Sequence, residues 1–299
     1  MYIHVRIFNG SVTIIYQVSD KKTGVYKMNM NPHNIKLVAV DMDGTFARSD
    51  YTYDIHRFNA IFSRMKEVGC AFVVASGNQY YQLRSLFPDH HNEMSFVAEN
   101  GALVKDKDTF IFSADIPKES IQSVLELCKN NPEIQNVMCG RNSAYCERGT
   151  VSKEFFELTN IYYHKLTWVD DFSQVEDQIL KFAPTVPVEK TEYYCDLFRE
   201  KLAGSLVPTS SGHGSVDLIV PGCHKAAGLE KLVQRWGITP EQCVAFGDGG
   251  NDLEMLAYCG RGYAMDNAPD AVKAVADEVC PSNDQDGVLV TLDRLFPLM

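Results

Sequence analysis

Apolar runs alternate with helical patterns in two separated parts of the chain. Residues 35–40 and 71–75 are predominantly apolar and predict strands that are buried on both faces of a parallel sheet. Between them, residues 55–68 carry apolar side chains at helical spacing, and Gly69 provides a stop. This strand–helix–strand pattern predicts a βαβ unit with a right-handed crossover.

The same alternation continues on both sides of a long middle segment. We therefore expect an α/β fold with a doubly wound, mostly parallel, Rossmann-like sheet, built from residues 35–113 and 214–299. The further elements are predicted as helices at 78–87, 225–236 and 270–276 and strands at 95–98, 216–220 and 243–246.

Residues 114–213 have a different pattern of apolar and polar positions. Helical patterns at 117–130, 152–158 and 197–203 are separated by short apolar and aromatic pieces. We interpret this segment as an α/β domain inserted into the first one.

The first 34 residues stand apart from both domains. Residues 2–18 alternate apolar and polar side chains around Asn9-Gly10, which is a strong hairpin signal. A lone hairpin is marginal in water. Two interpretations stay open: the hairpin docks on a sheet edge, or it belongs to an N-terminal extension upstream of a natural start at Met28 or Met30. The second is favoured.

Composition narrows the class of protein. No run approaches the about 18 apolar residues of a membrane span, and the N-terminus lacks a continuous apolar signal segment, so we expect a cytoplasmic protein without a membrane partner. Nine scattered cysteines never form Cys-x-x-Cys, which favours a reducing compartment. The net charge of −11 argues against nucleic acid as a partner. The oligomeric state is not indicated.

Polar residues follow three of the predicted strands. Asp41 and Asp43 come directly after residues 35–40, Ser76 follows 71–75, and Asp248 follows 243–246. In an open parallel sheet, ligands collect beyond the carboxyl ends of the strands. We therefore expect these side chains to meet in one crevice, with Gly44 allowing the sharp turn after Asp43.

Carboxylates, a lysine and tight turns are what phosphoryl transfer requires. We expect Asp41 to attack phosphorus as nucleophile, and Asp43 to act as general acid and then base. Mg²⁺ would be held by the Asp41 carboxylate, the main-chain carbonyl of Asp43, and Asp248. The phosphate group would be bound by Ser76, the Gly77 N–H, Lys225 and Asn251, with Asp252 and Thr45 in support.

Each signal is weak alone, since Asp-x-Asp is often a turn and a lone lysine is usually a solvated surface residue. Their joint occurrence at strand and helix ends favours the site. A phosphomutase of similar chemistry remains an alternative, as does a non-catalytic protein that senses Mg²⁺ and phosphate. The latter would be expected if a key carboxylate were absent, whereas Asp41, Asp43 and Asp248 are all present.

These segments resemble the four motifs of the haloacid dehalogenase (HAD) superfamily. Residues 41–45 match the first motif, Ser76 the second, Lys225 the third, and 247–252 the fourth. The insertion between the second and third motifs is similar to the α/β cap of the Cof-type class IIB phosphatases. Three further stretches, residues 73–82, 98–102 and 217–225, resemble bacterial sugar phosphatases of that group. The resemblance as a whole covers about residues 35–299.

The resemblance implies a phosphatase that acts on a small phosphorylated sugar, with acyclic polyol phosphates or flavin-related phosphates as further substrates and phosphotransfer as a side activity. It also implies a cap that closes over the crevice and excludes water. A polar loop of the insertion provides candidates for binding the sugar hydroxyls. These are Arg141, Asn142, Tyr145 and Glu147.

Overall fold

The computed structural model describes residues 3–8, 11–16, 34–212 and 214–298. The chain divides into residues 1–31 and residues 32–299. In the first unit, β1 (Ile3–Phe8) pairs with β2 (Ser11–Tyr16) in antiparallel register, which confirms the predicted strand pairing. The turn between them and the proposed starts at Met28 and Met30 lie outside the described residues.

The second unit is built on a large mixed sheet, whose strands run in the order β16-β15-β14-β3-β4-β5-β6-β7. From β16 to β5 neighbouring strands are parallel, whereas β6 and β7 are antiparallel additions at one edge. The strands are β3 (Leu37–Val40), β4 (Ala71–Ala75), β5 (Ser95–Ala98), β6 (Leu103–Asp106), β7 (Thr109–Ser113), β14 (Cys243–Gly247), β15 (Arg261–Met265) and β16 (Glu278–Cys280).

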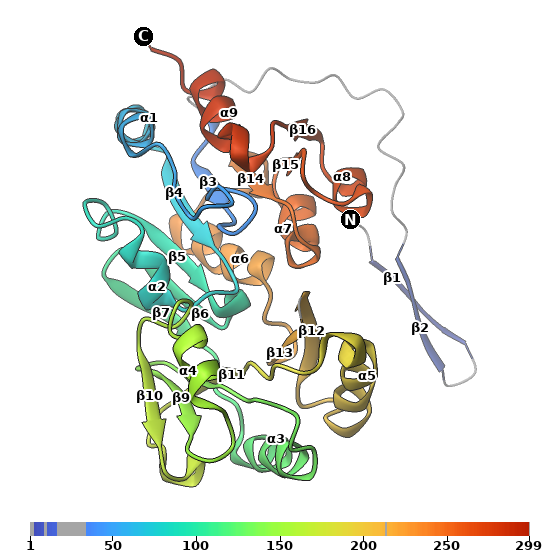
Figure 1. The fold of residues 1–299 in the computed structure, drawn as a ribbon. Helices are drawn as coiled ribbons and strands as arrows, with labels where there is room; N and C mark the ends of the chain where they lie inside the picture. The colour runs from blue at the N-terminus through green and yellow to red at the C-terminus, as the bar shows by residue number, and fades with distance from the viewer. Residues whose placement is uncertain (1–2, 9–10, 17–33, 213, 299) are drawn as a thin grey trace. The chain divides into compact units, whose positions relative to one another are not determined.

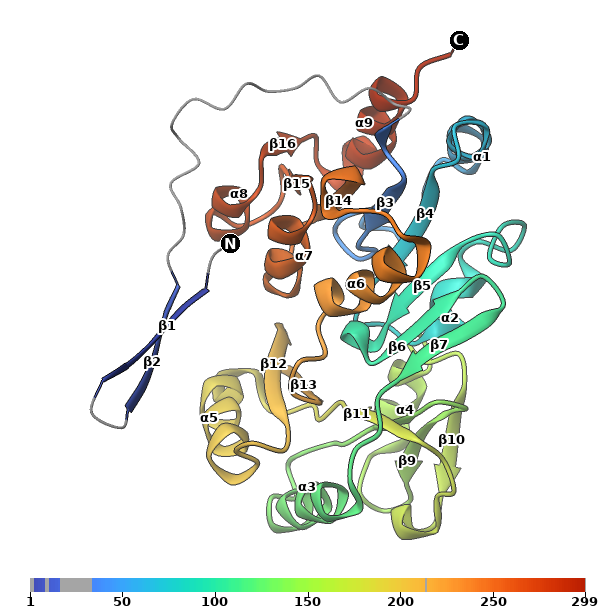
Figure 2. The ribbon, with the colours of Figure 1, turned by 180° about the vertical axis from the view of Figure 1, so that it is seen from behind.

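Helices cover both faces of this sheet (Figures 1 and 2), as the doubly wound prediction requires. Ala39 and Val73 pack in one cluster with α6, α7 and α8, whereas Phe72, the neighbour of Val73 in sequence, points to the other face and packs on Phe58 of α1. No helix within the described ranges is both long and apolar enough to span a bilayer. The helices are α1 (Ile55–Glu67), α2 (Tyr80–Ser85), α6 (Lys225–Trp236), α7 (Leu253–Tyr258), α8 (Asp270–Val275) and α9 (Gly287–Leu295).

A second, smaller sheet is inserted between β7 and α6, in the strand order β10-β9-β8-β11-β13-β12. Its own apolar core includes Phe182, Phe198 and Leu218. The expected α/β fold with an inserted α/β cap is thus confirmed. The cap elements are α3 (Lys118–Asn130), β8 (Met138–Gly140), β9 (Ala144–Glu147), α4 (Lys153–Thr159), β10 (Leu166–Val169), β11 (Ile179–Phe182), α5 (Thr191–Lys201), β12 (Val207–Gly212) and β13 (Ser215–Ile219).

One strand lies in a different sheet from the one expected. The strand predicted at 216–220 was assigned to the second core block, but β13 pairs with β11 and β12 of the smaller sheet. An apolar run predicts a buried strand without specifying its pairing partner. The residues at which the core gives way to the insertion, expected after 113 and before 214, stay a prediction.

Candidate active site

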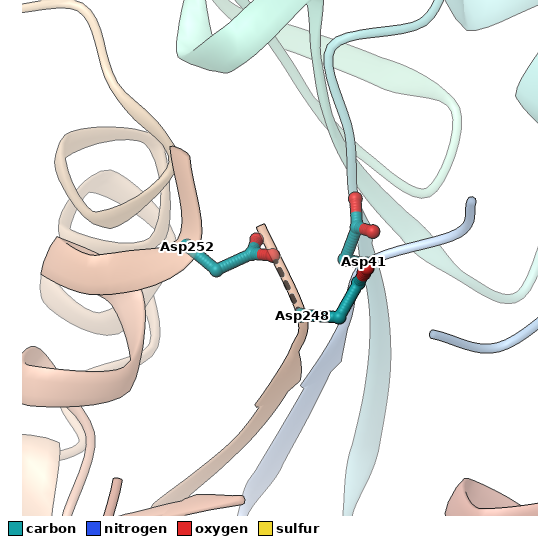
Figure 3. A group of neighbouring side chains, drawn as sticks. All are labelled: Asp41, Asp248 and Asp252. Carbon is teal, nitrogen blue, oxygen red and sulfur yellow. Dashed lines mark hydrogen bonds between the residues drawn. The ribbon is translucent and has the colours of Figure 1, made fainter. Parts of the chain in front are cut away.

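Two carboxylates lie side by side because their strands are neighbours. β3 and β14 pair in parallel register, with Val40 opposite Phe246, and the Asp41 N–H donates to the Phe246 carbonyl over 3.1 Å. Asp41 and Asp248 therefore leave the sheet at the same edge, and Asp252 reaches toward them from the following turn (Figure 3). Carboxylate oxygens of Asp41, Asp248 and Asp252 lie within 4.8 Å of one another. The predicted convergence of Asp41 with Asp248 is present.

The turn after Asp43 explains why glycine and threonine follow it. Gly44 has φ +77°, and a Cβ at this position would lie 2.5 Å from Asp248 Oδ2, so a side chain is excluded for two reasons. The next residue, Thr45, donates its hydroxyl to Asp248 Oδ1 over 2.7 Å. The turn therefore approaches the Asp248 carboxylate closely and holds one of its oxygens.

Lys225 provides the cation of the site. It is the first residue of α6, its side chain is fully buried, and Nζ lies 2.6 Å from both Asp41 Oδ1 and Asp252 Oδ1. Burial lowers the pKa of Lys225, but Asp252 and Asp41 outweigh it, so the pKa stands above its ordinary value. Burial raises the pKa of Asp41 well above its ordinary value, with Lys225 opposing this effect. The ammonium is therefore held in its charged form.

Asp252 supports the loop that carries Asp248. Its side chain is fully buried, and Oδ2 accepts hydrogen bonds from the N–H groups of Asp248, at 3.0 Å, and Gly249, at 2.9 Å. Its other oxygen accepts from Lys225. Since both oxygens are already engaged, Asp252 orients the neighbouring groups, in line with the supporting role expected for it.

The acidic group fits Mg²⁺ by its chemistry. All the donors are oxygens, which magnesium prefers, and three carboxylates against one ammonium leave two negative charges uncompensated. Burial also raises the pKa of Asp248, with the Thr45 hydroxyl and the Lys225 ammonium opposing this effect. Asp41 and Asp248 are the residues that would hold the ion. The Asp43 carboxylate lies outside this group, and the expected ligation through its main-chain carbonyl stays a prediction.

Ser76 and Asp43 are connected through Asn78. Ser76 is buried at the end of β4, and its Oγ accepts from the Asn78 N–H over 3.1 Å. The Asn78 side chain donates to Asp43 Oδ2 over 2.6 Å. Desolvation raises the pKa of Asp43, whereas Asn78 and Lys225 lower it. The Asp43 residue as a whole is exposed, so it lies at the rim of the crevice, next to the loop that follows β4.

Asn251 and Gly77 both contact Asn100, which follows β5. The Asn251 side chain donates to Asn100 Oδ1 over 3.1 Å, and a Cβ on Gly77 would meet the Asn100 amide at 3.1 Å. The loop that carries Gly77 and the loop that carries Asn251 therefore both pack against the buried Asn100 side chain.

The four cap candidates gather elsewhere. Asn142 and the Tyr145 hydroxyl both donate to Asp177, and the Arg141 guanidinium lies 4.8 Å from the centre of the Phe110 ring. Glu147 accepts from the main chain of Phe172. Arg141 and Asn142 line a cavity of about 450 Å³. In the described part of the chain, no hydrogen bond, ion pair or ring contact joins these four residues to the four motifs, and their role in substrate binding stays a prediction.

Sequence reasoning missed several polar contacts around the crevice. The sequence did contain an indication for Asn78, because this residue lies only two positions after Ser76 of the second motif. Lys181 also had one, because a lysine interrupts the apolar run Ile179–Phe182. Tyr51 and Tyr162 are exposed by 54% and 41%, and their hydroxyls lie 3.3 Å apart across the junction of core and cap. No signal in the sequence pairs two tyrosines that are 111 residues apart.

Comparison with known proteins agrees with this geometry. Residues 38–292 match the family model of haloacid dehalogenase-like hydrolases. The chain is 43% identical over 263 residues to 5-amino-6-(5-phospho-D-ribitylamino)uracil phosphatase YbjI of Escherichia coli (strain K12), covering 88% of this chain and 97% of that protein. It is 24% identical over 280 residues to 5-amino-6-(5-phospho-D-ribitylamino)uracil phosphatase YitU of Bacillus subtilis (strain 168), covering 88% of this chain and 98% of that protein.

A solved structure, SMU.1108c from Streptococcus mutans UA159, superposes with a TM-score of 0.82 at 37% identity, covering 87% of this chain and 98% of that one. The chain belongs to the haloacid dehalogenase-like hydrolases, as a Cof-type phosphatase with a class IIB cap. The resemblance seen in the four motifs is confirmed.

Proposed function

We propose that this protein is a Mg²⁺-dependent phosphatase that hydrolyses a phosphomonoester through an aspartyl-phosphate intermediate. The observation that carries the proposal is the group of Asp41, Asp248 and Asp252 carboxylates around the buried Lys225 ammonium, at the carboxyl ends of two parallel strands. A phosphomutase would need the same group, but no contact of the described residues favours it.

In the first step, Asp41 attacks phosphorus. Oδ1 is held by Lys225, which leaves Oδ2 to form the new bond. The bond from phosphorus to the leaving oxygen breaks, and Asp43 transfers its proton to that oxygen. The raised pKa of Asp43 suits this role, because a carboxyl group must hold a proton near neutral pH to act as an acid.

In the second step, water attacks the phosphorus of the aspartyl-phosphate. Asp43, now ionised, takes the proton of the water. The bond between phosphorus and Asp41 breaks, which releases inorganic phosphate and restores the carboxylate. An alcohol in place of water would give phosphotransfer to a second molecule.

The remaining residues bind and orient the phosphate. Lys225 lies beside Asp41, Ser76 offers a hydroxyl, and Gly77 offers its main-chain N–H. Bound Mg²⁺ would supply positive charge where the phosphate dianion meets the carboxylates. Unit charges about 4 Å apart at an effective dielectric of about 20 interact by about 4 kcal/mol, so the dianion would be strongly repelled without such compensation.

We infer that the leaving group is a phosphorylated polyol chain that carries a ring, as in 5-amino-6-(5-phospho-D-ribitylamino)uracil, rather than a simple sugar. Two relatives have that substrate in their names. Two exposed aromatic side chains, Tyr51 and Tyr162, lie beside the crevice; the hydrogen bond with Tyr162 raises the pKa of Tyr51 most, and the Asp43 charge adds to it. A planar ring stacks on tyrosine, whereas a sugar offers less planar surface.

The reaction is tested by measuring inorganic phosphate released from a panel of phosphomonoesters. The panel contains the ribitylaminouracil phosphate, sugar phosphates and nucleotides, each assayed with Mg²⁺ and with EDTA. Asp41→Asn should lower kcat at least about 10³-fold, because it removes the nucleophile. Asp89→Asn, an exposed carboxylate outside the motifs, is the matched control and should keep wild-type activity.

Activity that survives in Asp41→Asn would refute the covalent mechanism. Equal activity in EDTA would refute the metal requirement. A preference for simple sugar phosphates over the ribitylaminouracil phosphate would overturn the substrate while leaving the mechanism intact. Isomerised product in place of free phosphate would identify a phosphomutase.

A further inference from the structure

A lysine of the cap is buried beneath the crevice. Lys181 of β11 is 2% exposed, although lysine is almost never fully buried unless it is paired. Its Nζ donates to the main-chain carbonyl of Gly77 over 2.8 Å and to Asp217 Oδ1 over 3.0 Å, and lies 3.1 Å from Glu99 Oε2. Asp217 is in the cap strand β13, whereas Gly77 and Glu99 follow strands of the core sheet.

The ion pair alone does not account for the position of this lysine. Asp217 and Glu99 both lie beside the ammonium, and burial raises the pKa of Glu99, with Lys181 opposing this effect. The other Asp217 oxygen accepts from the Asn100 side chain over 2.7 Å. The contact with the Gly77 carbonyl is additional to these ion pairs, and it is the one that reaches the loop after β4.

The Gly77–Asn78 peptide connects that lysine to the site. Its carbonyl accepts from Lys181, and its N–H donates to Ser76 Oγ over 3.1 Å. Because the peptide unit is planar, holding the oxygen also directs the N–H. A charged donor on the oxygen polarises the peptide and strengthens the bond from its N–H.

Ser76 and Asp43 both depend on that peptide. Since Ser76 Oγ accepts from the peptide, its own proton is directed elsewhere, and among the described residues it has no acceptor. The side chain of the next residue, Asn78, donates to Asp43 Oδ2. A rotation of this one peptide would therefore move a phosphate donor and the general acid together.

We propose that Lys181 is a positioning residue for phosphoryl transfer, which fixes the Gly77–Asn78 peptide so that the Ser76 hydroxyl points at the phosphate and Asn78 holds Asp43. The cap thereby contributes to the chemical step from below the crevice, through the core loop and without touching the substrate. This inference rests on the phosphate-binding role of Ser76 in the proposed function.

The test needs a pair of variants that differ only at Lys181. Lys181→Met alone would leave the Asp217 charge buried without its partner, and such a protein could fail to fold. Asp217→Asn keeps the lysine, with Glu99 available as its counter-charge, and Lys181→Met/Asp217→Asn removes both charges. Both variants lack the Asp217 charge, so they differ only in the Lys181 ammonium and in its contacts with the Gly77 carbonyl and Glu99, and thermal unfolding shows whether both are folded.

With Mg²⁺ and the phosphomonoester that the panel identifies, the double variant should have a kcat roughly 10- to 100-fold below that of Asp217→Asn, with a similar KM. Adding Ser76→Ala to both should shrink that ratio, because the part of the effect that passes through the Ser76 hydroxyl is lost, while the part that passes through Asn78 and Asp43 stays. Equal kcat in the two parent variants would overturn the proposal. So would an undiminished ratio in the Ser76→Ala background.

Binding of inorganic phosphate, measured by calorimetry, separates this inference from the proposed function. The double variant should bind phosphate about 10-fold more weakly than Asp217→Asn, and equal affinities would count against the positioning role. If the wild-type protein releases no phosphate from any phosphomonoester, the proposed function fails. The two phosphate affinities would then still decide whether Lys181 organises the loop.

Discussion

Tyr51 and Tyr162 are the residues that distinguish this crevice from a purely polar one. Tyr51 follows the first motif in the core, Tyr162 follows α4 in the cap, and their hydroxyls lie 3.3 Å apart. Both rings are exposed, and their hydroxyl contact brings them together as a pair across the junction of core and cap. Their use is therefore open to a direct test on substrate preference.

Tyr51→Ala should lower kcat/KM for the ribitylaminouracil phosphate about 10-fold, since loss of a stacking partner costs about 0.5–1.5 kcal/mol beyond the buried area. It should lower kcat/KM for a small sugar phosphate much less. Steady-state kinetics on both substrates gives the ratio. Tyr51→Phe keeps the ring and removes only the hydroxyl, so it should stay near wild type. Equal losses of kcat/KM on both substrates would show that Tyr51 supports the fold and does not stack on the ring of the substrate.

At the scale of elements, the position of Lys225 depends on how α6 packs on the sheet. Lys225 opens the helix, and His224 before it accepts a hydrogen bond from the Ala227 N–H. One turn later Gly228 faces β5, where a Cβ would lie 2.3 Å from Val97 Cγ1. The close approach of helix and strand fixes the depth at which the ammonium enters the crevice.

Gly228→Ala should therefore destabilise the protein by about 1–3 kcal/mol, the usual cost of overpacking a dense core. It should also lower activity, because the helix that carries Lys225 must shift. Denaturant unfolding and phosphate release measure the two effects. Val97→Ala removes the clashing methyl groups, so the double variant Gly228→Ala/Val97→Ala should recover part of both losses. Simple additivity of the two substitutions would contradict the packing argument.

For the unit of residues 32–299 as a whole, a metal ion held by Asp41 and Asp248 would join two distant motifs and so raise the free energy of unfolding. A ligand that binds only the folded protein at 100 times its Kd adds about 2.7 kcal/mol. Mg²⁺ should raise the melting temperature of the wild type, and Asp248→Asn should abolish most of that increase. Asp43→Asn, whose carboxylate lies outside the acidic group, should keep it. Thermal unfolding with Mg²⁺ and with EDTA decides between these outcomes. An equal increase in Asp248→Asn would exclude Asp248 as a ligand.

The junction of core and cap should make stability depend on pH through Glu99. Burial raises its pKa above the ordinary 4.5, with Lys181 opposing. At a pH between 4.5 and the raised pKa of the folded state, Glu99 is protonated in the folded protein and ionised in the unfolded chain. The free energy of unfolding therefore falls as pH rises, by at most about 1.4 kcal/mol per pH unit.

Glu99→Gln cannot titrate. The difference in unfolding free energy should thus move in favour of this variant as the pH rises above about 4.5. Denaturant unfolding at several pH values measures this, and Glu254→Gln, at an exposed position of α7, is the control. A curve for Glu99→Gln parallel to that of the wild type would contradict the prediction.

The core sheet and the acidic end of the crevice could be predicted from the apolar pattern. The strands expected at 35–40, 71–75 and 243–246 are present, the first of them as the shorter Leu37–Val40, because continuous apolar runs have few alternatives in a parallel sheet. The residues that follow such strands must lie at one edge, so Asp41, Asp248 and Ser76 could be placed in advance. Short elements without a clear period were not predicted, among them α9, which is apolar on most sides.

The side chains that share a proton or a charge across long separations in sequence are brought together by the packing of the folded chain. Lys181 lies 104 residues from Gly77, Tyr51 lies 111 residues from Tyr162, and β13 belongs to the cap sheet although it precedes α6. Periodicity describes which face of an element is buried, but not which element covers it. That choice follows from the packing of the cap on the core, since a buried ammonium is stable only where acceptors from several segments meet around it.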